Sequence, residues 1–323
     1  MIIIYLNNCN KILTLLYNMS HKEVAIFTGG DSKYFELLND LIISIRKQNN
    51  DINMIIIDSG LKAEQIEVLK NNNNIQIINA EKMLINDNIE RKSIISILRL
   101  RLKEICVTYS LNYKILIWLD ADTWVQNLEI LLKNCTNIAN KKKLAIVSQN
   151  SRNSERSLYA QKIIELGTWS LFRLRNIVYK NSKGLGLTND MLTKLEAKPT
   201  LNSGVFALHI DSPHWEKMRF WQQYIIDNGG KQFNSDQLSI GYTIYLDNYD
   251  YELLPDTCNY LCGCYKLRYN ENTKKFVEYH SPYDEISVMH FCGLTKFIKD
   301  WEMREVYNMS DEKTMKSILY AKQ

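Results

Sequence analysis

Short apolar runs alternate with helical stretches along the first half of the chain, and this alternation constrains the fold more than any other feature. The runs VAIFTGG, MIIIDSG and IQIINA, which begin at residues 24, 54 and 75, have the character of buried strands that end in turns. Residues 34–46 carry leucine and isoleucine on one helical face, and residues 61–70 form a second predicted helix. This alternation predicts an α/β fold with a Rossmann-like, mostly parallel sheet flanked by helices.

The same pattern continues with less regularity toward the C-terminus. Residues 94–109 are predicted to be helical, and KILIWLDADTWV is predicted to be a buried strand that ends abruptly in acidic residues. LAIVS at 144–148 and SGVFALHI at 203–210 add two strands, whereas 151–199 is too long for a plain connection and is interpreted as a helical insertion. No interdomain linker is visible. We therefore expect one domain over residues 21–301, an N-terminal extension over 1–20 and a helical C-terminal tail over 302–323.

Composition excludes several classes of protein. The 323 residues are 46% hydrophobic and 24% charged, enough to bury a large core, so disorder is not expected. A net charge of +4 is too small to indicate a nucleic-acid partner or an anionic membrane surface. The 7 cysteines have no regular spacing, so we expect a reducing compartment and a cytoplasmic protein. The group Cys258, Cys262 and Cys264 lacks a paired zinc-type spacing, and we favour buried thiols over a metal site there.

The N-terminal segment is the candidate for targeting. Its apolar stretch from Ile2 to Tyr17 is interrupted by three asparagines and a lysine, so it is too short to span a membrane and lacks the order of a signal peptide. We interpret it as an extension before Met19, with a helix lying on a membrane surface as the alternative. At most, then, the chain makes a peripheral membrane contact.

Two carboxylates at the end of a buried strand are the strongest chemical signal. Asp120 and Asp122 follow the apolar run that ends at Leu119, at the end of a strand where open α/β sheets bind ligands. Oxygen ligands at this spacing can converge on one hard divalent cation and link it to a diphosphate. The plainer alternative is a solvated turn in which Asp122 caps the next segment.

A second signal lies near the C-terminus, in VMHFCGLTK. His290 follows an apolar strand, Gly293 permits close backbone approach, and Lys296 supplies a positive charge three residues later. This set suits a metal ion together with a diphosphate. Alone, His290 would be interpreted as a core histidine.

Two further motifs carry polar side chains beside predicted structural elements. Asn202, Ser203 and Gly204 precede a buried strand and offer an amide, a hydroxyl and an unhindered backbone to sugar hydroxyls. Asp236 and Gln237 stand before an amphipathic helix. A simple turn and a helix N-cap, respectively, are the plainer interpretations.

Taken together and in this order, the motifs resemble glycosyltransferase family 8, the retaining nucleotide-sugar transferases of the GT-A fold that include glycogenin and bacterial lipopolysaccharide galactosyl- and glucosyltransferases. The blocks are Thr28-Gly29-Gly30, LDADTWV, LNSGVFALHI, FNSDQLSIGYTIY and HFCGLTK, and they extend over residues 23–301. The resemblance implies a GT-A fold and Mn²⁺, or Mg²⁺, bound by Asp120, Asp122 and His290. It also implies a site for the sugar-nucleotide donor. Thr28 and Gly29 would lie beside the uridine, and Gly293 and Lys296 would contact the diphosphate. The other implied donor-binding residues are Ala121, Asn202, Ser203 and Gly204. The family arginine that reaches the donor corresponds to Arg99 or Arg101, and we prefer Arg99.

The activity implied is transfer of a hexose from a UDP-sugar to the hydroxyl of a saccharide, glycolipid or protein acceptor, with retention. Asp236 is the motif carboxylate left for the anomeric carbon, with Gln237 beside it. We expect residues 151–199 and the aromatic group Trp215, Phe220, Trp221 and Tyr224 to form acceptor walls, with core packing as the alternative for the aromatic group. Two other functions stay open: nucleotidyl transfer to a sugar phosphate, and a catalytically silent protein that binds nucleotide sugars.

Overall fold

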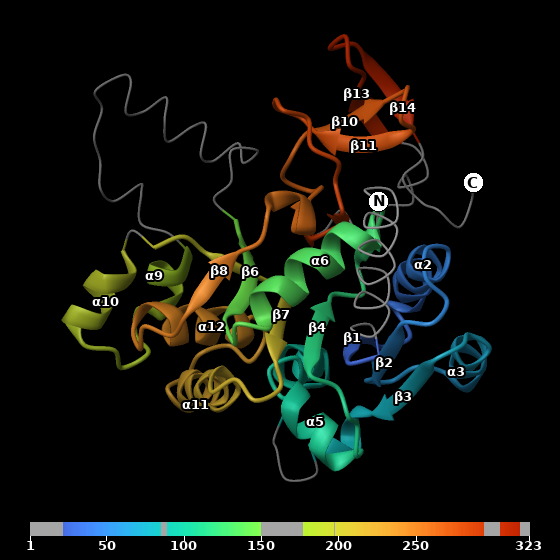
Figure 1. The fold of residues 1–323 in the computed structure, drawn as a ribbon. Coiled ribbons are helices and arrows are strands. Elements are labelled where there is room, and N and C mark those ends of the chain that lie inside the picture. The colour runs from blue at the N-terminus through green and yellow to red at the C-terminus, as the bar shows by residue number, and fades with distance from the viewer. Residues whose placement is uncertain (1–21, 85–88, 150–176, 197, 294–303, 317–323) are drawn as a thin grey trace, which may run out of the picture.

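In the described part of the chain, seven strands form the central sheet, in the order β3-β2-β1-β4-β7-β6-β8 (Figure 1). The computed structural model describes residues 22–84, 89–149, 177–196, 198–293 and 304–316. The strands of this sheet are β1 (Val24–Gly30), β2 (Asn53–Asp58), β3 (Ile75–Asn79), β4 (Ile115–Leu119), β6 (Leu144–Ser148), β7 (Leu201–His209) and β8 (Tyr251–Leu253).

Strand direction divides this sheet into two parts. Strands β3, β2, β1 and β4 are mutually parallel, as the alternation of strands and helices predicts. Strand β7 runs antiparallel to both β4 and β6, while β6 and β8 are parallel. The α/β fold with a mostly parallel sheet is therefore confirmed, and β7 is its reversed member. This reversal places the start of β7 next to the end of β4.

Helices cover both faces of the sheet (Figure 1). The α-helices are α2 (Phe35–Arg46), α3 (Ala63–Lys70), α4 (Ile94–Leu98), α5 (Leu102–Thr108), α6 (Leu128–Ala139), α9 (Ile177–Ser182), α10 (Asn189–Leu195), α11 (His214–Asp227) and α12 (Ser235–Tyr245). Short 3-10 helices are η1 (Ala80–Met83), η2 (Arg91–Ser93) and η3 (Asp256–Asn259).

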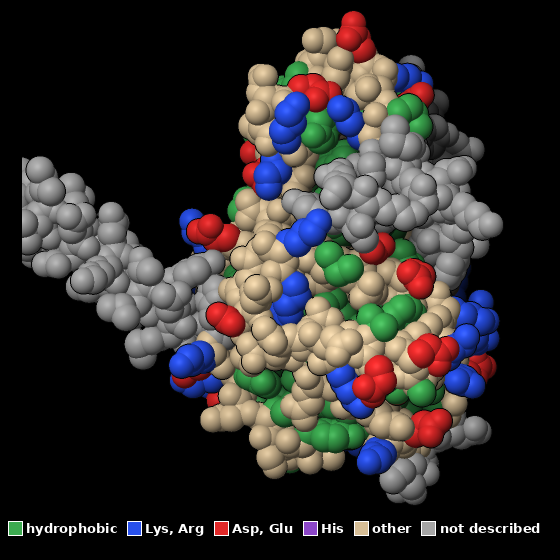
Figure 2. Space-filling view, turned by 90° about the vertical axis from the view of Figure 1, so that its right-hand side faces the viewer, with side chains coloured by type: hydrophobic (Ala, Val, Ile, Leu, Met, Phe, Trp, Pro, Cys, Tyr) green, Lys and Arg blue, Asp and Glu red, His purple; other side chains and the backbone are tan. Residues whose placement is uncertain are grey.

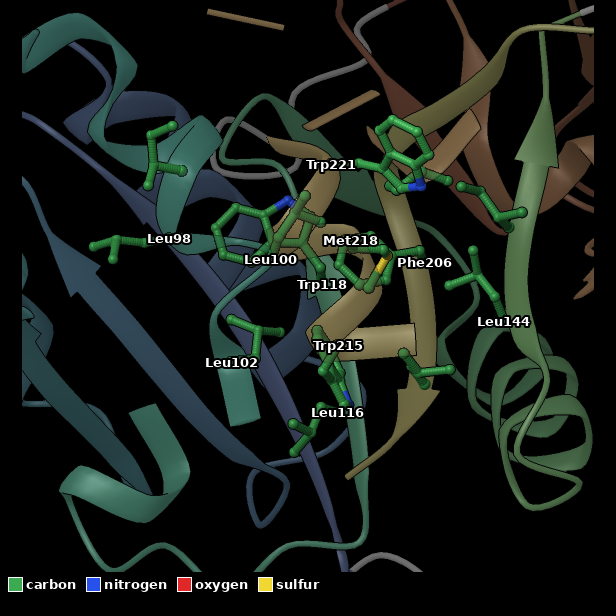
Figure 3. Packing of buried hydrophobic residues seen from close by; sticks show 14 of the residues in the cluster. Leu98, Leu100, Leu102, Leu116, Trp118, Leu144, Phe206, Trp215, Met218 and Trp221 are labelled. Carbon is green, nitrogen blue, oxygen red and sulfur yellow. The ribbon is translucent and has the colours of Figure 1, made fainter. Parts of the chain in front are cut away.

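The two faces of the sheet belong to two separate hydrophobic clusters because successive strand residues point to opposite sides. In β4, Leu116 and Trp118 join the cluster beneath α4, α5, α11 and α12, while Ile115, Ile117 and Leu119 join the one beneath α2 and α6. Figure 3 shows Trp118 among labelled neighbours of the first cluster. Burial on both faces explains why these strands read as continuous apolar runs.

The predicted helix over residues 94–109 is broken. Helix α4 ends at Leu98 and α5 begins at Leu102, with Arg99 as the C-cap of α4. The sequence contains neither glycine nor proline at this break. The break turns Arg99 toward the end of β4, where its guanidinium meets carboxylates.

The described residues form two smaller sheets besides the central one, and the four-stranded one lies at the top of Figure 1. One contains β5 (Thr123–Val125), β12 (Val288–His290) and β9 (Tyr260–Leu261), in the order β5-β12-β9. The other, in the order β11-β10-β13-β14, contains β10 (Leu267–Asn270), β11 (Lys275–Glu278), β13 (Arg304–Tyr307) and β14 (Lys313–Lys316). A third hydrophobic cluster, which includes Trp124, Tyr260 and Val306, joins them.

The C-terminal tail is expected to be helical, and over its described residues that expectation is wrong. Strands β13 and β14 form an antiparallel pair, and β13 pairs with β10 at Tyr307 and Arg268. Asn308 stabilises the turn between β13 and β14, because its side-chain oxygen accepts hydrogen bonds from the backbone N–H groups of Ser310 and Glu312. Val306 is fully buried in the third cluster. Packing against β10, which local sequence does not reveal, therefore decides the structure of this segment.

The surface agrees with the small net charge. On the face shown in Figure 2, lysine and arginine side chains are interspersed with aspartate and glutamate. None of the helices within the described ranges has the length and hydropathy needed to cross a membrane. The N-terminal extension, residues 1–20, and residues 151–176 of the predicted insertion lie outside the described residues.

Candidate active site

Asp120, Asp122 and His290 meet at the end of β4. One ligand atom from each of the three lies within 4.8 Å of the others. His290 Nε2 is 3.4 Å from Asp122 Oδ1 and 3.9 Å from Asp120 Oδ2. Asp122 and His290 are buried, and Asp120 is partly exposed. The structure thus brings together an acidic pair and a histidine that lie far apart in the sequence.

Strand pairing produces this convergence. Strand β5 follows Asp122 directly and pairs antiparallel with β12, which puts His290 opposite Thr123. The backbone N–H of Phe291 donates to the carbonyl of Asp122 at 2.8 Å. Because the acidic turn and β12 are joined by backbone hydrogen bonds, the histidine is held beside the carboxylates.

The chemistry of this donor set fits a divalent metal ion. Two carboxylates and one imidazole suit Mn²⁺, which accepts both oxygen and nitrogen ligands. The two carboxylates repel each other when both are ionised, and a divalent cation between them would remove that repulsion. In the described ranges this is the one group of three such side chains that can hold a metal.

The three cysteines grouped in the sequence differ in exposure. Cys258 and Cys262 are buried, while Cys264 is exposed. Burial raises the pKa of Cys258 to about 12, so it stays a protonated, unreactive thiol at neutral pH. Two of the three cysteines are thus buried thiols, and Cys264 is not.

Arg99 links Asp120, in the acidic turn, to Asp236 at the start of α12. Its guanidinium lies 2.9 Å from Asp120 Oδ1 and 3.2 Å from Asp236 Oδ2. It also donates to the backbone oxygen and the hydroxyl of Ser203. Burial lowers the pKa of Arg99, but the carboxylates outweigh burial and hold that pKa above its ordinary value. Arg99, the preferred of the two arginines, therefore reaches the site as a permanent cation.

Asp236 is buried beside this cation. It lies in the first turn of α12, after Asn234, whose left-handed backbone (φ 68°) is the N-cap. Ser203 donates its hydroxyl to Asp236 Oδ2 at 2.5 Å. Burial raises the pKa of Asp236, and Arg99 and Ser203 only partly offset that rise. The result is a carboxylate positioned by three elements, α4, β7 and α12.

A cleft of about 1260 Å³ joins these groups. Its lining includes nearly all predicted site residues within the described part of the chain, namely Gly29, Arg99, Asp120, Ala121, Asp122, Asn202, Ser203, Gly204, Asp236, Gln237, His290 and Gly293. Its volume exceeds that of most pockets that bind one small molecule.

The two glycines that end β1 lie on the cleft, but Thr28 does not. Thr28 is fully buried in β1, whereas Gly29 and Gly30 line the cleft. A Cβ on Gly29 would stand 2.6 Å from the carbonyl oxygen of Ile57, so only glycine fits there. Thr28 is therefore not on the cleft surface, although the family resemblance implies that it lies beside the uridine.

The last motif is only partly described. Gly293 lines the cleft and has a φ of +82°, a backbone conformation that favours glycine. Lys296 lies outside the described residues.

The aromatic side chains expected to form an acceptor wall lie elsewhere. Trp215 and Trp221 are 3% and 5% exposed and belong to the core cluster, in agreement with the packing alternative (Figure 3). Among the described lining residues, the aromatic rings of the cleft are those of Tyr34 and Phe233. Phe233 is half exposed.

Two further side chains, which the sequence does not predict, contact the metal-site residues. Trp118 donates its indole N–H to Asp120 Oδ1 at 2.8 Å, and a tryptophan two residues before an acidic residue is a signal that the sequence contains. Asn259 Oδ1 lies 2.8 Å from His290 Nδ1, and nothing in the sequence around Asn259 indicates this contact.

No protein-family model matches the chain, and no curated protein matches it in sequence. Among solved structures, the chain is similar to the galactosyltransferase LgtC in complex with donor and acceptor sugar analogues, with 16% identity, a TM-score of 0.49 and coverage of 84% of this chain and 87% of that one. An active-site mutant of LgtC gives 16% identity and a TM-score of 0.48 over 83% of this chain and 87% of that one. Mouse xyloside xylosyltransferase 1 in its apo form gives 12% identity and a TM-score of 0.47 over 83% of this chain and 96% of that one.

Proposed function

We propose that the chain is a metal-dependent glycosyltransferase that moves a hexose from a UDP-sugar to an acceptor hydroxyl with retention of configuration. One observation carries the proposal. Asp120, Asp122 and His290 share a cleft with the buried carboxylate of Asp236, at the strand ends where α/β sheets bind nucleotides.

The metal group and the two glycines at the end of β1 define the donor end of the cleft. A divalent cation bound by Asp120, Asp122 and His290 would supply positive charge to the diphosphate that leaves. Gly29 and Gly30 expose backbone at the end of β1 for the uridine, and Gly293 does so for the diphosphate. Lys296 is proposed as an additional counter-charge.

Asp236 acts at the anomeric carbon of the donor sugar, and Arg99 positions Asp236. The bond from the anomeric carbon to the diphosphate oxygen breaks, a bond to the acceptor oxygen forms, and the acceptor proton leaves with the diphosphate. Positive charge grows on the sugar ring as the bond breaks, and the carboxylate of Asp236 stabilises it. Arg99 keeps Asp236 and Asp120 in place through contacts to both. No covalent intermediate is required by this arrangement.

The acceptor lies in the remaining space of the cleft. Phe233 offers an exposed ring to a sugar face, and Gln237 offers an amide for its hydroxyls. These groups favour a saccharide, either free or as part of a glycolipid or glycoprotein.

The experiment incubates the purified protein with a panel of labelled nucleotide sugars, with Mn²⁺, with Mg²⁺ and with EDTA. Metal-dependent release of UDP or transfer of the hexose is expected. Transfer of the nucleotidyl group to a sugar phosphate would identify the first alternative, and binding without turnover would identify a silent protein. Turnover that persists in excess EDTA would remove metal dependence from the proposal.

Asp122→Asn is the matched variant, because it retains shape and removes the charge of a buried ligand. Its Mn²⁺ affinity and turnover should fall together, by at least the roughly 10–100-fold known for outer-shell partners. Asp211→Asn, an exposed site at the end of β7, is the control and should behave as wild type.

A further inference from the structure

A chain of four buried polar groups ends on the imidazole of His290. The backbone N–H of Gly204 donates to Asn202 Oδ1 at 2.9 Å, and Asn259 Nδ2 donates to the same oxygen at 2.9 Å. Asn259 Oδ1 then lies 2.8 Å from His290 Nδ1. Asn202, Asn259 and His290 are 7%, 0% and 3% exposed, which leaves little access for water to interrupt the chain.

The direction of every hydrogen bond in this chain follows from its first member. A backbone N–H can only donate, so the Asn202 atom that faces Gly204 is the amide oxygen. That oxygen accepts, so the Asn259 atom that faces it is the NH₂ group. The other Asn259 atom is consequently oxygen, and His290 Nδ1 must carry a proton to donate to it. The orientation of both amides is therefore fixed by the backbone of β7.

This proton assignment determines what the other ring nitrogen offers. When the imidazole is neutral and Nδ1 carries its proton, the lone pair is on Nε2. Nε2 is the atom that faces Asp122 and Asp120, at 3.4 and 3.9 Å. The tautomer required by Asn259 is therefore the one that can bind a metal held by the two carboxylates.

The fold holds Asn259 firmly enough for this role. Asn259 ends η3 and directly precedes β9, which pairs in parallel with β12 beside His290. The N–H of Cys262, the residue directly after β9, donates to the His290 carbonyl at 2.9 Å. Backbone pairing thus holds both partners of the side-chain hydrogen bond in register.

We propose that Asn259 is a positioning residue that fixes the metal-binding tautomer of His290, with the Gly204 N–H as the donor that sets its direction. The use of this tautomer rests on the metal-dependent function proposed above, but its existence does not. The test therefore measures tautomer and metal affinity, and it involves no sugar transfer.

The first measurement is ¹⁵N NMR of the imidazole nitrogens in metal-free, histidine-labelled protein, with His290→Gln to assign the signals. Neutral His290 in wild type should show a protonated Nδ1 and an unprotonated Nε2. Asn259→Asp retains an acceptor for Nδ1 and should retain this pattern, whereas Asn259→Leu removes the acceptor and should lose it. A wild-type ring protonated on Nε2 alone would overturn the proposal, whatever the variants do.

The second measurement is the affinity for Mn²⁺ alone, from the electron paramagnetic resonance signal of the free ion. Asn259→Leu should weaken binding by about 10–100-fold, the usual effect of losing an outer-shell partner. Asn127→Leu removes an asparagine that caps α6 away from the site, and it should leave the affinity unchanged. Equal affinities in wild type and Asn259→Leu would overturn the proposal. Normal tautomer and metal results without any sugar transfer would overturn the proposed function and support the role of Asn259.

Discussion

The ring of His290 lies directly against the backbone of Gly204. A Cβ built at position 204 would stand 2.4 Å from Cε1 of the ring and 2.9 Å from Nδ1. The ring cannot retreat, because Asn259 holds Nδ1 and the whole side chain is buried. The backbone of Gly204 does not have a positive φ, so its conformation does not require glycine. Glycine is required at 204 because the His290 ring leaves no room for a Cβ.

Gly204→Ala should consequently displace the imidazole and weaken Mn²⁺ binding by at least about 10-fold, because the ring is a direct ligand in our proposal. Titration with Mn²⁺ measures this. Gly241→Ala in α12 is the control, because a Cβ there meets its nearest neighbour, Val178 Cγ1, at an ordinary 3.5 Å. Unchanged metal affinity in Gly204→Ala would mean that the ring position is not needed for binding.

Arg99→Leu should destabilise the fold strongly. Arg99 is 8% exposed, and its removal leaves Asp120 and the buried Asp236 without their shared cation. Loss of one partner of a buried ion pair costs about 3–5 kcal/mol, which urea unfolding will measure. Arg219→Leu removes an exposed arginine paired with Glu104, for which about 0–1 kcal/mol is expected. Similar losses in the two variants would contradict the central position given to Arg99.

Lys296→Ala tests the last motif of the sequence. A lysine charge near the diphosphate matters most as negative charge grows there, so kcat should fall more than donor affinity. The expected loss is roughly 10²-fold to 10³-fold in rate. Lys299→Ala, a nearby lysine outside the motif, is the control. Steady-state kinetics with equal and negligible effects in both variants would show that Lys296 lies away from the reaction.

The stability of the protein should fall in mild acid because of His214. Ser212 and the carbonyl of Asp250 contact its two ring nitrogens at 2.7 and 2.8 Å. Burial lowers the pKa of His214 below its ordinary value of 6.5. Below pH 6.5 the imidazole of His214 gains a proton in the unfolded chain but not yet in the folded chain. The free energy of unfolding therefore falls as the pH drops from 6.5 toward the lowered pKa of the folded state. Urea midpoints from about pH 7.5 to about pH 5 should decline less steeply in His214→Gln; equal slopes would refute this.

The sequence predicted the parts of the site that follow buried strands. Asp120 and Asp122 are recognisable because acidic residues end a long apolar run, and a parallel sheet places such ends at one edge. His290 was associated with them through the family resemblance, since its contact depends on pairing between β5 and β12. Asn259 offered no signal, because an isolated asparagine has many uses in turns and caps.

Tertiary packing explains where local patterns failed. The helical spacing of apolar residues continues through residues 99–101, yet the helix is interrupted there. Arg99 instead pairs with carboxylates from the end of β4 and from α12. Trp215 and Trp221 were equally suited to a binding surface and to a core, and their burial beneath α11 depends on the sheet they cover. Contacts between distant segments decide such cases, and local propensity does not contain them.

Phe233 and Phe220 offer a matched test of the acceptor site. Both rings are about half exposed, at 50% and 54%, but Phe233 lines the cleft and Phe220 lies on the outer side of α11. If an acceptor sugar stacks on Phe233, Phe233→Ala should raise the acceptor KM while the hydrolysis of donor without acceptor stays at its wild-type rate. A stacking contact is worth about 0.5–1.5 kcal/mol beyond its buried area, so an increase of roughly 3-fold to 10-fold is expected. Phe220→Ala should change neither quantity, since its ring faces solvent outside the cleft. An equal rise in both variants would point to a general loss of structure, and no rise in Phe233→Ala would place the acceptor against another wall of the cleft.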